Sequence, residues 1–192
     1  MKQNIIISIL GPDGSGKSTL IKVLKKKLLR QKKKLKTFHL KPYFVSNKKA
    51  KIVKNPHNQV LRSNFLSFLK LLYWLIIFRL YFIIKIFIPS DIFLFDRYPD
   101  DILIDPKRYR FKLSSKLSEN ILKFFPRPDL WIIMIEKPKI IWSRKQEVDY
   151  ETLIKQINKY KKFAKNKKNS IIFSQRNNIS KIEKYLNYNF KV

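Results

Sequence analysis

All three glycines of this 192-residue chain lie in one short loop, at positions 11, 14 and 16. The loop has the sequence GPDGSGKST over residues 11–19 and fits the pattern G-x-x-x-x-G-K-(S/T). An apolar, β-branched run precedes it over Asn4–Leu10, and apolar residues recur at helical spacing after it, over Lys17–Lys36. Glycines let successive backbone N–H groups turn around phosphate oxygens, and the following helix adds its positive N-terminal end. The order of strand, loop and helix therefore predicts a phosphate-binding loop, or P-loop.

The residue types in the loop also predict its ligands. Lys17 is expected to bridge the β- and γ-phosphates of ATP, and Ser18 to ligate Mg²⁺. The predicted nucleotide-binding residues are Gly11, Asp13, Gly14, Ser15, Gly16, Lys17, Ser18 and Thr19.

Further apolar runs extend the pattern along the chain. We expect strands at Lys36–Leu40, Asp91–Phe95, Leu130–Ile135 and Ser170–Phe173, and a closing helix near Ile179–Leu186. Strands without clean alternation, separated by helical stretches, indicate a parallel sheet covered on both faces. At 45% hydrophobic residues, the chain can bury a core of its own, so we expect a single domain over residues 1–192.

A second chemical signal stands at the end of the third predicted strand, where Asp96 is followed by Arg97. A carboxylate at the carboxyl end of a strand beside the first strand can reach the magnesium shell. The arginine can then bind an acceptor phosphate or the charge that develops in the transition state. The pair is therefore interpreted as catalytic, with Asp96 joining Ser18 as a metal ligand; a surface ion pair is the alternative.

The most apolar stretch, Val60–Ile88, suggests a membrane span at first sight. Lys70, Arg79 and Lys85 interrupt it, however, and leave no apolar run near the roughly 18 residues that a span requires. We expect a long helix half-buried against the sheet, with peripheral membrane contact as the alternative.

The composition is strongly basic, with 43 Lys and Arg against 13 Asp and Glu, or a formal charge of +30. The excess is mostly lysine and accompanies many Asn, Ile, Phe and Tyr residues, which indicates genome base composition as much as a partner. The absence of cysteine excludes disulfides and thiolate metal sites, and the first ten residues lack the features of a secretory signal. The cytoplasm is the expected compartment.

Nucleic-acid binding should accordingly be weak. We expect affinity for DNA or RNA to fall steeply with salt and largely to disappear at about 150 mM, without sequence preference. Fluorescence anisotropy with labelled oligonucleotides checks this, and nanomolar affinity at that salt concentration would contradict it.

Taken together, three segments resemble the thymidylate kinase family of P-loop nucleoside monophosphate kinases. They are GPDGSGKST, FDRY, and PDLWIIMIE before a short helix that carries Arg and Lys. The resemblance covers Ile5 to about Phe173. It implies an α/β fold of the three-layer P-loop NTPase type, with a five-stranded parallel sheet between helices. It also implies a lid over the transferred phosphate, at about residues 138–150.

The same resemblance implies residue roles. Asp13 would face the acceptor's sugar, Arg97 would meet the acceptor phosphate, and Arg144 and Lys145 fall where the family keeps its lid cations. Lys17, Asp96, Arg97 and Arg144 are therefore the predicted catalytic residues.

The segment after Tyr98 departs from the family. Thymidylate kinases continue with small residues and a Tyr-Gln pattern that positions the thymine base, and residues 98–110 lack it. DRYPDDILIDPKRYR, PRPDL and RKQE instead resemble a divergent branch found among bacterial polysaccharide-synthesis proteins. Asp101, Asp105, Arg108 and Arg110 either form an acceptor pocket or are ion pairs that order the loop.

These observations favour an ATP-dependent phosphotransferase with a small phosphate acceptor. A nucleoside monophosphate is the leading acceptor, and a sugar or sugar phosphate of bacterial surface polysaccharide synthesis is the alternative. A nucleotide-binding switch or nucleic-acid-associated ATPase is the hypothesis from another class. The sequence leaves a homodimer open.

Overall fold

The computed structural model describes residues 4–42, 57, 59–86, 92–174, 182, 184 and 185. The longer elements are β1 (Ile5–Leu10), α1 (Lys17–Arg30), β2 (Leu35–His39), α2 (Asn64–Ile86), β3 (Ile92–Asp96), α3 (Ser115–Leu122), β4 (Leu130–Met134), α4 (Pro138–Arg144), α5 (Tyr150–Lys165) and β5 (Ser170–Phe173). Two short 3₁₀ helices, η2 (Pro99–Leu103) and η3 (Lys107–Tyr109), lie between β3 and α3.

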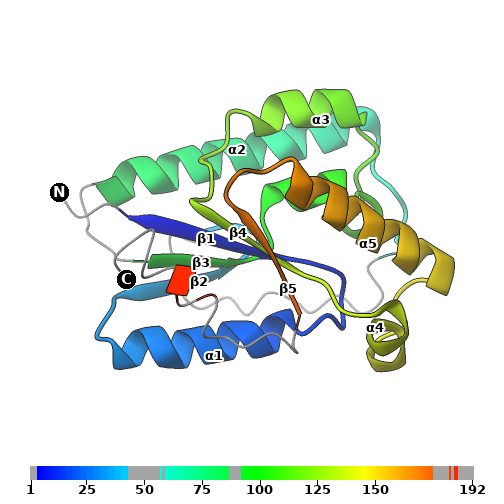
Figure 1. The fold of residues 1–192 in the computed structure, drawn as a ribbon. Coiled ribbons are helices and arrows are strands. Elements are labelled where there is room, and N and C mark those ends of the chain that lie inside the picture. The colour runs from blue at the N-terminus through cyan, green and yellow to red at the C-terminus, as the bar shows by residue number, and fades with distance from the viewer. Residues whose placement is uncertain are drawn as a thin grey trace.

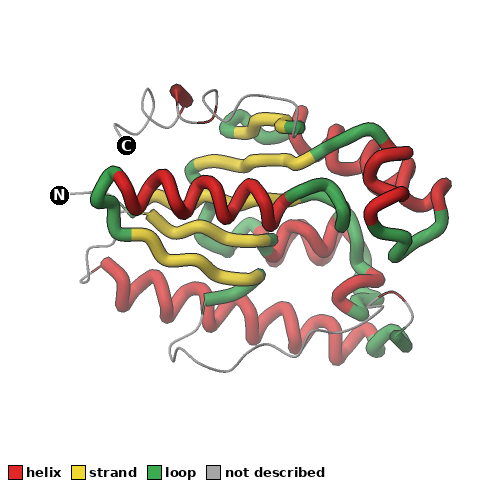
Figure 2. The backbone as a smooth tube through the Cα atoms, turned by 90° about the horizontal axis from the view of Figure 1, so that it is seen from below, coloured by secondary structure: helices red, strands yellow, loops and turns green. Residues whose placement is uncertain are grey.

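The five strands form one parallel sheet in the order β2-β3-β1-β4-β5. Helix α1 covers one face, and α2, α3 and α5 cover the other, so the molecule has three layers (Figure 1). Figure 2 shows the strands side by side with α1 in front of them. The predicted fold class, a parallel five-stranded sheet between helices, is confirmed.

Burial on both faces explains why the strands do not alternate in sequence. Every residue of β1 is buried. Ile7 and Ile9 face the leucines of α1, whereas Ile6 and Leu10 belong to the aromatic-rich core on the opposite face. Both faces of a central parallel strand must be apolar, because helices pack on each side.

The element ends differ from the sequence prediction in a few places. Helix α1 ends at Arg30, before the predicted Lys36, because Lys32 takes a left-handed conformation with φ 56° and β2 begins at Leu35. The lysine-rich turn carries no sequence feature that would end a helix. Asp91 and most of the expected closing helix near Ile179–Leu186 lie outside the described residues, and positions 182, 184 and 185 of that helix are helical.

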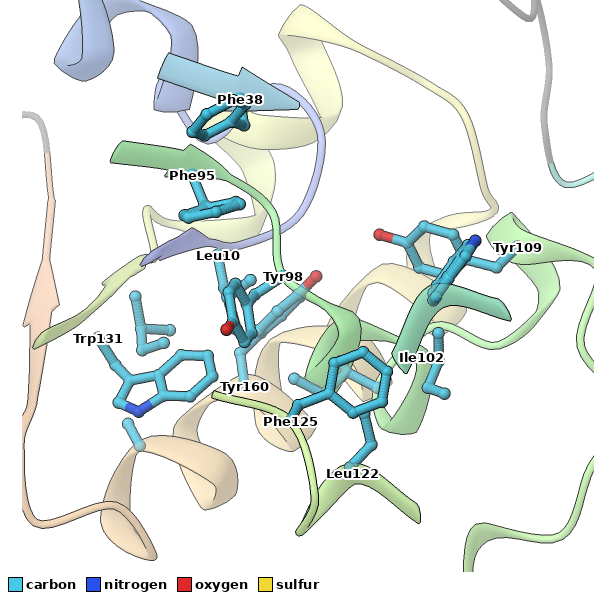
Figure 3. Close-up of a cluster of buried hydrophobic side chains, with 14 of the residues drawn as sticks. Leu10, Phe38, Phe95, Tyr98, Ile102, Tyr109, Leu122, Phe125, Trp131 and Tyr160 are labelled. Atoms are coloured by element: carbon cyan, nitrogen blue, oxygen red, sulfur yellow. The ribbon is translucent and has the colours of Figure 1, made fainter. Parts of the chain in front are cut away.

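The aromatic core fixes the turn that follows β3. Tyr98 is fully buried, and its ring stands edge-on to Phe95 and Trp131, with centroid distances of 5.2 and 5.5 Å (Figure 3). Edge-to-face contacts of this kind stabilise buried aromatic rings. Because Tyr98 directly follows Asp96 and Arg97, its anchoring holds those two side chains at the end of the sheet.

Helix α2 has two apolar faces. Leu71, Trp74 and Phe78 are buried against the sheet, whereas Phe65 and Ile76 on the opposite side are 68% and 56% exposed. Among the described residues it is the one helix long and apolar enough to cross a membrane, over Asn64–Ile83, and 28% of that stretch is buried.

We predict that α2 does not cross a bilayer. Its buried face packs against the sheet, and Lys70 and Arg79 would each cost about 2.5 to 3.5 kcal/mol at a membrane centre. Fractionation should release the protein from membranes with high salt and carbonate. A protein that stayed in the pellet after both washes would contradict the prediction.

Candidate active site

The P-loop follows β1 and wraps the start of α1. Gly11 has φ 145°, and a Cβ there would collide with the carbonyl oxygen of Met134. A Cβ on Gly14, which has φ 84°, would lie 2.9 Å from the carbonyl oxygen of Ile141. The first glycine therefore lets the loop pass β4, and the second lets α4 approach the loop.

Lys17 is buried inside the turn of the loop. Its ammonium donates to the carbonyl oxygens of Gly11 and Pro12, at 2.9 and 2.7 Å. Burial lowers the pKa of Lys17 to about 8, and the neighbouring charge of Arg97 adds to this effect, against the attraction of Asp13. The ammonium is thus held where its charge is poorly solvated, which strengthens its attraction for an anionic group.

Asp96 ends β3 beside Ile9 of β1, as the sequence predicts. Its Oδ1 is buried and has no hydrogen-bond partner among the described residues. Ser18 lines the same pocket with an exposed hydroxyl group. An unpaired carboxylate oxygen near a P-loop serine fits the oxygen ligands that Mg²⁺ takes beside a nucleotide. Among the described residues, no group of three or more His, Cys, Asp or Glu side chains could hold a metal ion alone.

Arg97 has an unusual backbone conformation for a residue other than glycine, with φ 74°. Its N–H donates to the carbonyl oxygen of Ile9 at 3.0 Å, which ties the end of β3 to β1. The side chain is 3% exposed, and its guanidinium donates to Asp101 at 2.5 Å and to Asp13. A left-handed arginine at a strand end is a strained arrangement of the kind that gathers at functional sites.

Asp101 holds the guanidinium of Arg97 in place. Its carboxylate is fully buried and accepts hydrogen bonds from the hydroxyl groups of Tyr109 and Tyr160, each at 2.6 Å, in addition to Arg97. Burial and the charge of Asp101 raise the pKa of both tyrosines well above the usual value. The two hydroxyl groups therefore stay protonated and act as fixed donors to the carboxylate.

Asp13 is the centre of the charged network. Its carboxylate receives Arg97, Arg108 at 2.7 Å, Lys145 at 3.1 Å and Lys17 at 3.3 Å. Burial alone would raise the pKa of Asp13, but Arg97, Lys17 and Arg108 outweigh it and lower the pKa well below the usual range. Four cations thus converge on one point beside the P-loop, where they can also meet the oxygens of phosphate groups.

The end of α4 and the segment after it add charged groups over the loop. Arg144 is exposed, and its guanidinium lies 3.4 Å from the carbonyl oxygen of Gly14. Lys145 and Arg108 share Glu147, at 2.5 and 2.9 Å. The expected lid segment therefore touches the P-loop directly.

The predicted site residues fall around one pocket of about 580 Å³. Those that line it are Asp13, Gly14, Gly16, Lys17, Ser18, Thr19, Asp96, Arg97 and Arg144, together with His39, Arg108 and Lys145. Gly11 and Ser15, which belong to the same loop, are buried and do not line the pocket.

Some site residues carried no specific sequence signal. Tyr160 and His57 have no motif around them, Glu147 ends the segment RKQE but was given no role, and Arg108 was left open between an acceptor pocket and a loop ion pair. The small number of acidic residues could have pointed to the site, because the chain has only 13 Asp and Glu residues and several of them lie at this pocket. The acids at or beside the site are Asp13, Asp96, Asp101, Asp105 and Glu147.

A larger cavity of about 830 Å³ lies beside this pocket, between η3, the segment after α4 and the start of α5. A small space of about 10 Å³ lies between the two, and it shares Asp13 and Arg97 with the pocket and His57 and Asp105 with the cavity. The ion pairs of Asp13 with Arg97 and Arg108 therefore separate the pocket from the cavity.

Comparisons with known proteins bear on the fold. No protein-family model and no curated protein sequence matches the chain. Among solved structures, it is similar to thymidylate kinase from Ehrlichia chaffeensis, with a TM-score of 0.56 and 16% sequence identity over 91% of this chain and 89% of that one. The chain therefore has a P-loop fold like that of thymidylate kinase.

Proposed function

We propose that this protein is an ATP-dependent kinase that transfers the γ-phosphoryl group of ATP to a nucleoside monophosphate in the cytoplasm. The convergence of Lys17, Arg97 and the lid cations on one pocket, at the carboxyl end of a parallel sheet, carries the proposal. Open parallel sheets bind their ligands at this edge.

The transfer needs little covalent chemistry from the protein. The bond between the γ-phosphorus and the β–γ bridging oxygen breaks, an acceptor phosphate oxygen bonds to the γ-phosphorus, and ADP leaves. An ionised acceptor phosphate gives up no proton in this step. Lys17 holds the donor phosphates, and Arg97 and Arg144 neutralise charge on the transferred group and acceptor.

Ser18 and Asp96 are the residues that would hold Mg²⁺ bound with ATP. The unpaired Oδ1 of Asp96 and the exposed hydroxyl of Ser18 in the same pocket support this assignment. The ion would supply positive charge that offsets the negative charge of the transferred phosphoryl group.

Thymidine monophosphate should be a poor acceptor. Residues 98–110 lack the base-positioning pattern of thymidylate kinases, and a site without such hydrogen-bond partners loses its preference for that base. We expect kcat/KM below about 10⁴ M⁻¹s⁻¹, the lower end of the ordinary enzyme range. A coupled ADP-release assay over nucleoside monophosphates, sugars and sugar phosphates measures it. Efficient thymidine monophosphate turnover would show that other residues recognise the base.

A sugar phosphate is the second candidate acceptor, and the lining of the larger cavity favours it. Most lining side chains are polar or charged, and the aromatic rings among the described lining residues are those of Trp142 and His57. Bases in protein sites generally stack on aromatic or guanidinium planes, whereas hydroxyl-rich rings need many hydrogen-bonding groups.

A further inference from the structure

The outward face of α2 carries a continuous row of exposed apolar side chains, which we call the α2 stripe. Its members recur three or four residues apart, the spacing of neighbours on one side of a helix. At a rise of about 1.5 Å per residue, the stripe is roughly 27 Å long. Single exposed apolar residues are ordinary, but a continuous stripe indicates an interaction surface. The members, which are 44 to 68% exposed, are Phe65, Leu66, Leu69, Tyr73, Ile76, Leu80 and Ile83.

The charged residues of α2 itself are all positive. Arg79 is exposed and lies beside the stripe on the same helix. The ammonium of Lys41 lies 5.0 Å from the ring centre of Tyr73, a member of the stripe. No Asp or Glu occurs between Asp13 and Asp91, so α1, β2 and α2 contain no acid. The stripe is therefore bordered by cations that its own segment cannot neutralise.

A cluster of cations lies at the N-terminal half of the stripe. Lys70 donates to the carbonyl oxygen of Tyr109 at 2.8 Å. Burial, followed by the charges of Arg62, Arg110 and Lys41, lowers the pKa of Lys70 to about 8. In the described part of the chain, none of these four cations is ion-paired with a carboxylate. An anionic group beside the cluster would relieve the repulsion among its charges.

Apolar side chains bordered by unpaired cations fit the surface of an anionic bilayer. The apolar side chains of an interfacial helix enter the boundary between headgroups and acyl chains, and Lys and Arg meet the lipid phosphates. Long Lys and Arg stems let the charged ends reach those phosphates while the helix lies deeper. The opposite face of α2 packs against the sheet, so the helix would lie along the membrane surface and not across it.

A second copy of the chain fits the stripe less well. Two α2 helices packed along their stripes would bring Arg79 and the Lys70 cluster of both copies together. Neither helix has an acid to pair with them, and like charges across an interface oppose association. The apolar length alone would suit either partner, so the charge distinguishes between them.

We propose that the α2 stripe is a docking surface for an anionic lipid bilayer, to which the protein binds peripherally. The stripe enters the interface, and Arg79 and the Lys70 cluster contact lipid phosphates. This contact does not depend on phosphoryl transfer, so it stands or falls separately from the proposed function.

Co-sedimentation with large lipid vesicles is the test. One set of vesicles contains phosphatidylcholine alone, and the other also contains about 30% phosphatidylglycerol as the anionic lipid. We expect the protein to bind the anionic vesicles at least about tenfold more tightly, because each cation near such a surface contributes about fivefold.

Substitutions separate the stripe from the general positive charge of the protein. Leu69→Gln and Ile76→Gln should each weaken binding about tenfold, the usual worth of transferring one large apolar side chain. Arg79→Gln should weaken binding to the anionic vesicles about fivefold and leave the neutral ones unchanged. Leu29→Gln and Lys26→Gln change exposed residues of α1, on the other face of the sheet, and are the matched controls. They should alter binding less than about twofold, because salt screens charges that lie far from the membrane.

A second measurement locates the contact without weakening it. The chain has no cysteine, so Ile76→Cys and Leu29→Cys each allow one environment-sensitive fluorophore to be attached at a known position. We expect anionic vesicles to shift the emission of the label at Ile76 to the blue and to leave the label at Leu29 unchanged.

Three outcomes would overturn the inference. The first is equal binding, or none, to anionic and neutral vesicles. The second is binding that the stripe variants keep as well as the α1 controls do, which would assign it to the +30 charge as a whole. The third is a wild-type dimer in analytical ultracentrifugation that Leu69→Gln or Ile76→Gln splits into monomers, which would assign the stripe to a second copy.

Discussion

Replacing Lys17 by alanine will remove most ATP-dependent phosphoryl transfer and leave the fold intact. Lys17 is the cation inside the P-loop, and its ammonium is held by Gly11 and Pro12 at the position where donor phosphates bind in such loops. The loss of one fixed group that stabilises transition-state charge costs about 10²- to 10³-fold in kcat.

The fold should tolerate this change because burial already opposes the charged form of Lys17, whose pKa is lowered to about 8. Asp13 keeps Arg97, Arg108 and Lys145 as partners. We expect the melting temperature to change by less than about 4 °C, which corresponds to about 1 kcal/mol for a chain of this size. Lys22→Ala, an exposed lysine on the same helix, is the control and should keep full activity.

Replacing Arg97 by alanine should instead destabilise the protein strongly. The change leaves the carboxylate of Asp101 in a fully buried position without its cation. Breaking a buried ion pair from one side costs about 3 to 5 kcal/mol, because the remaining charge stays desolvated. Thermal or urea unfolding of the variant measures the loss.

A second substitution tests the reason for that loss. Asp101→Asn in the Arg97→Ala background removes the stranded charge and should recover part of the stability. Arg144→Ala is the matched comparison, because this exposed arginine should alter the free energy of unfolding by no more than about 0.5 kcal/mol. Equal losses in Arg97→Ala and Arg144→Ala would contradict the account of Asp101.

The sequence predicted the parts of the site that local pattern determines. The glycines, the apolar run before them and the helical spacing after them define the P-loop, because its mechanism needs those residue types in that order. Asp96 was placed correctly beside β1, since a strand followed at once by charged residues points them at the edge of the sheet. The fold class followed from the same repetition of strands and helices.

Contacts between side chains that lie far apart in the sequence could not be predicted from local pattern. Tyr160 reaches Asp101 from 59 residues away, and Lys145 reaches Asp13 from 132 residues away. Tyr160 carries no motif, and Lys145 was expected among the lid cations without any sign that Asp13 is its partner. Both contacts depend on how α5 and the lid segment pack. Their packing is set by the aromatic core under α5 and by Gly14, which lets α4 come close to the loop.

The predicted end of α1 was wrong for a different reason. Lys32 takes a left-handed conformation in a run of lysines, and lysine has good helix propensity. The helix stops because β2 must begin at Leu35 to pair with Ile92 of β3. Tertiary pairing overrides the local preference at this point.

The central claim is that the protein transfers a phosphoryl group from ATP bound at the P-loop to a small molecule. This claim can be tested without knowing the acceptor. The protein is incubated with ATP labelled at the γ-phosphate, Mg²⁺ and an extract of small metabolites, and mass spectrometry locates the label. The account predicts that label appears on a small-molecule phosphate ester with wild type and falls at least about 100-fold with Lys17→Ala. Label that stays in ATP, or that is released only as inorganic phosphate at the same rate by both proteins, would contradict it.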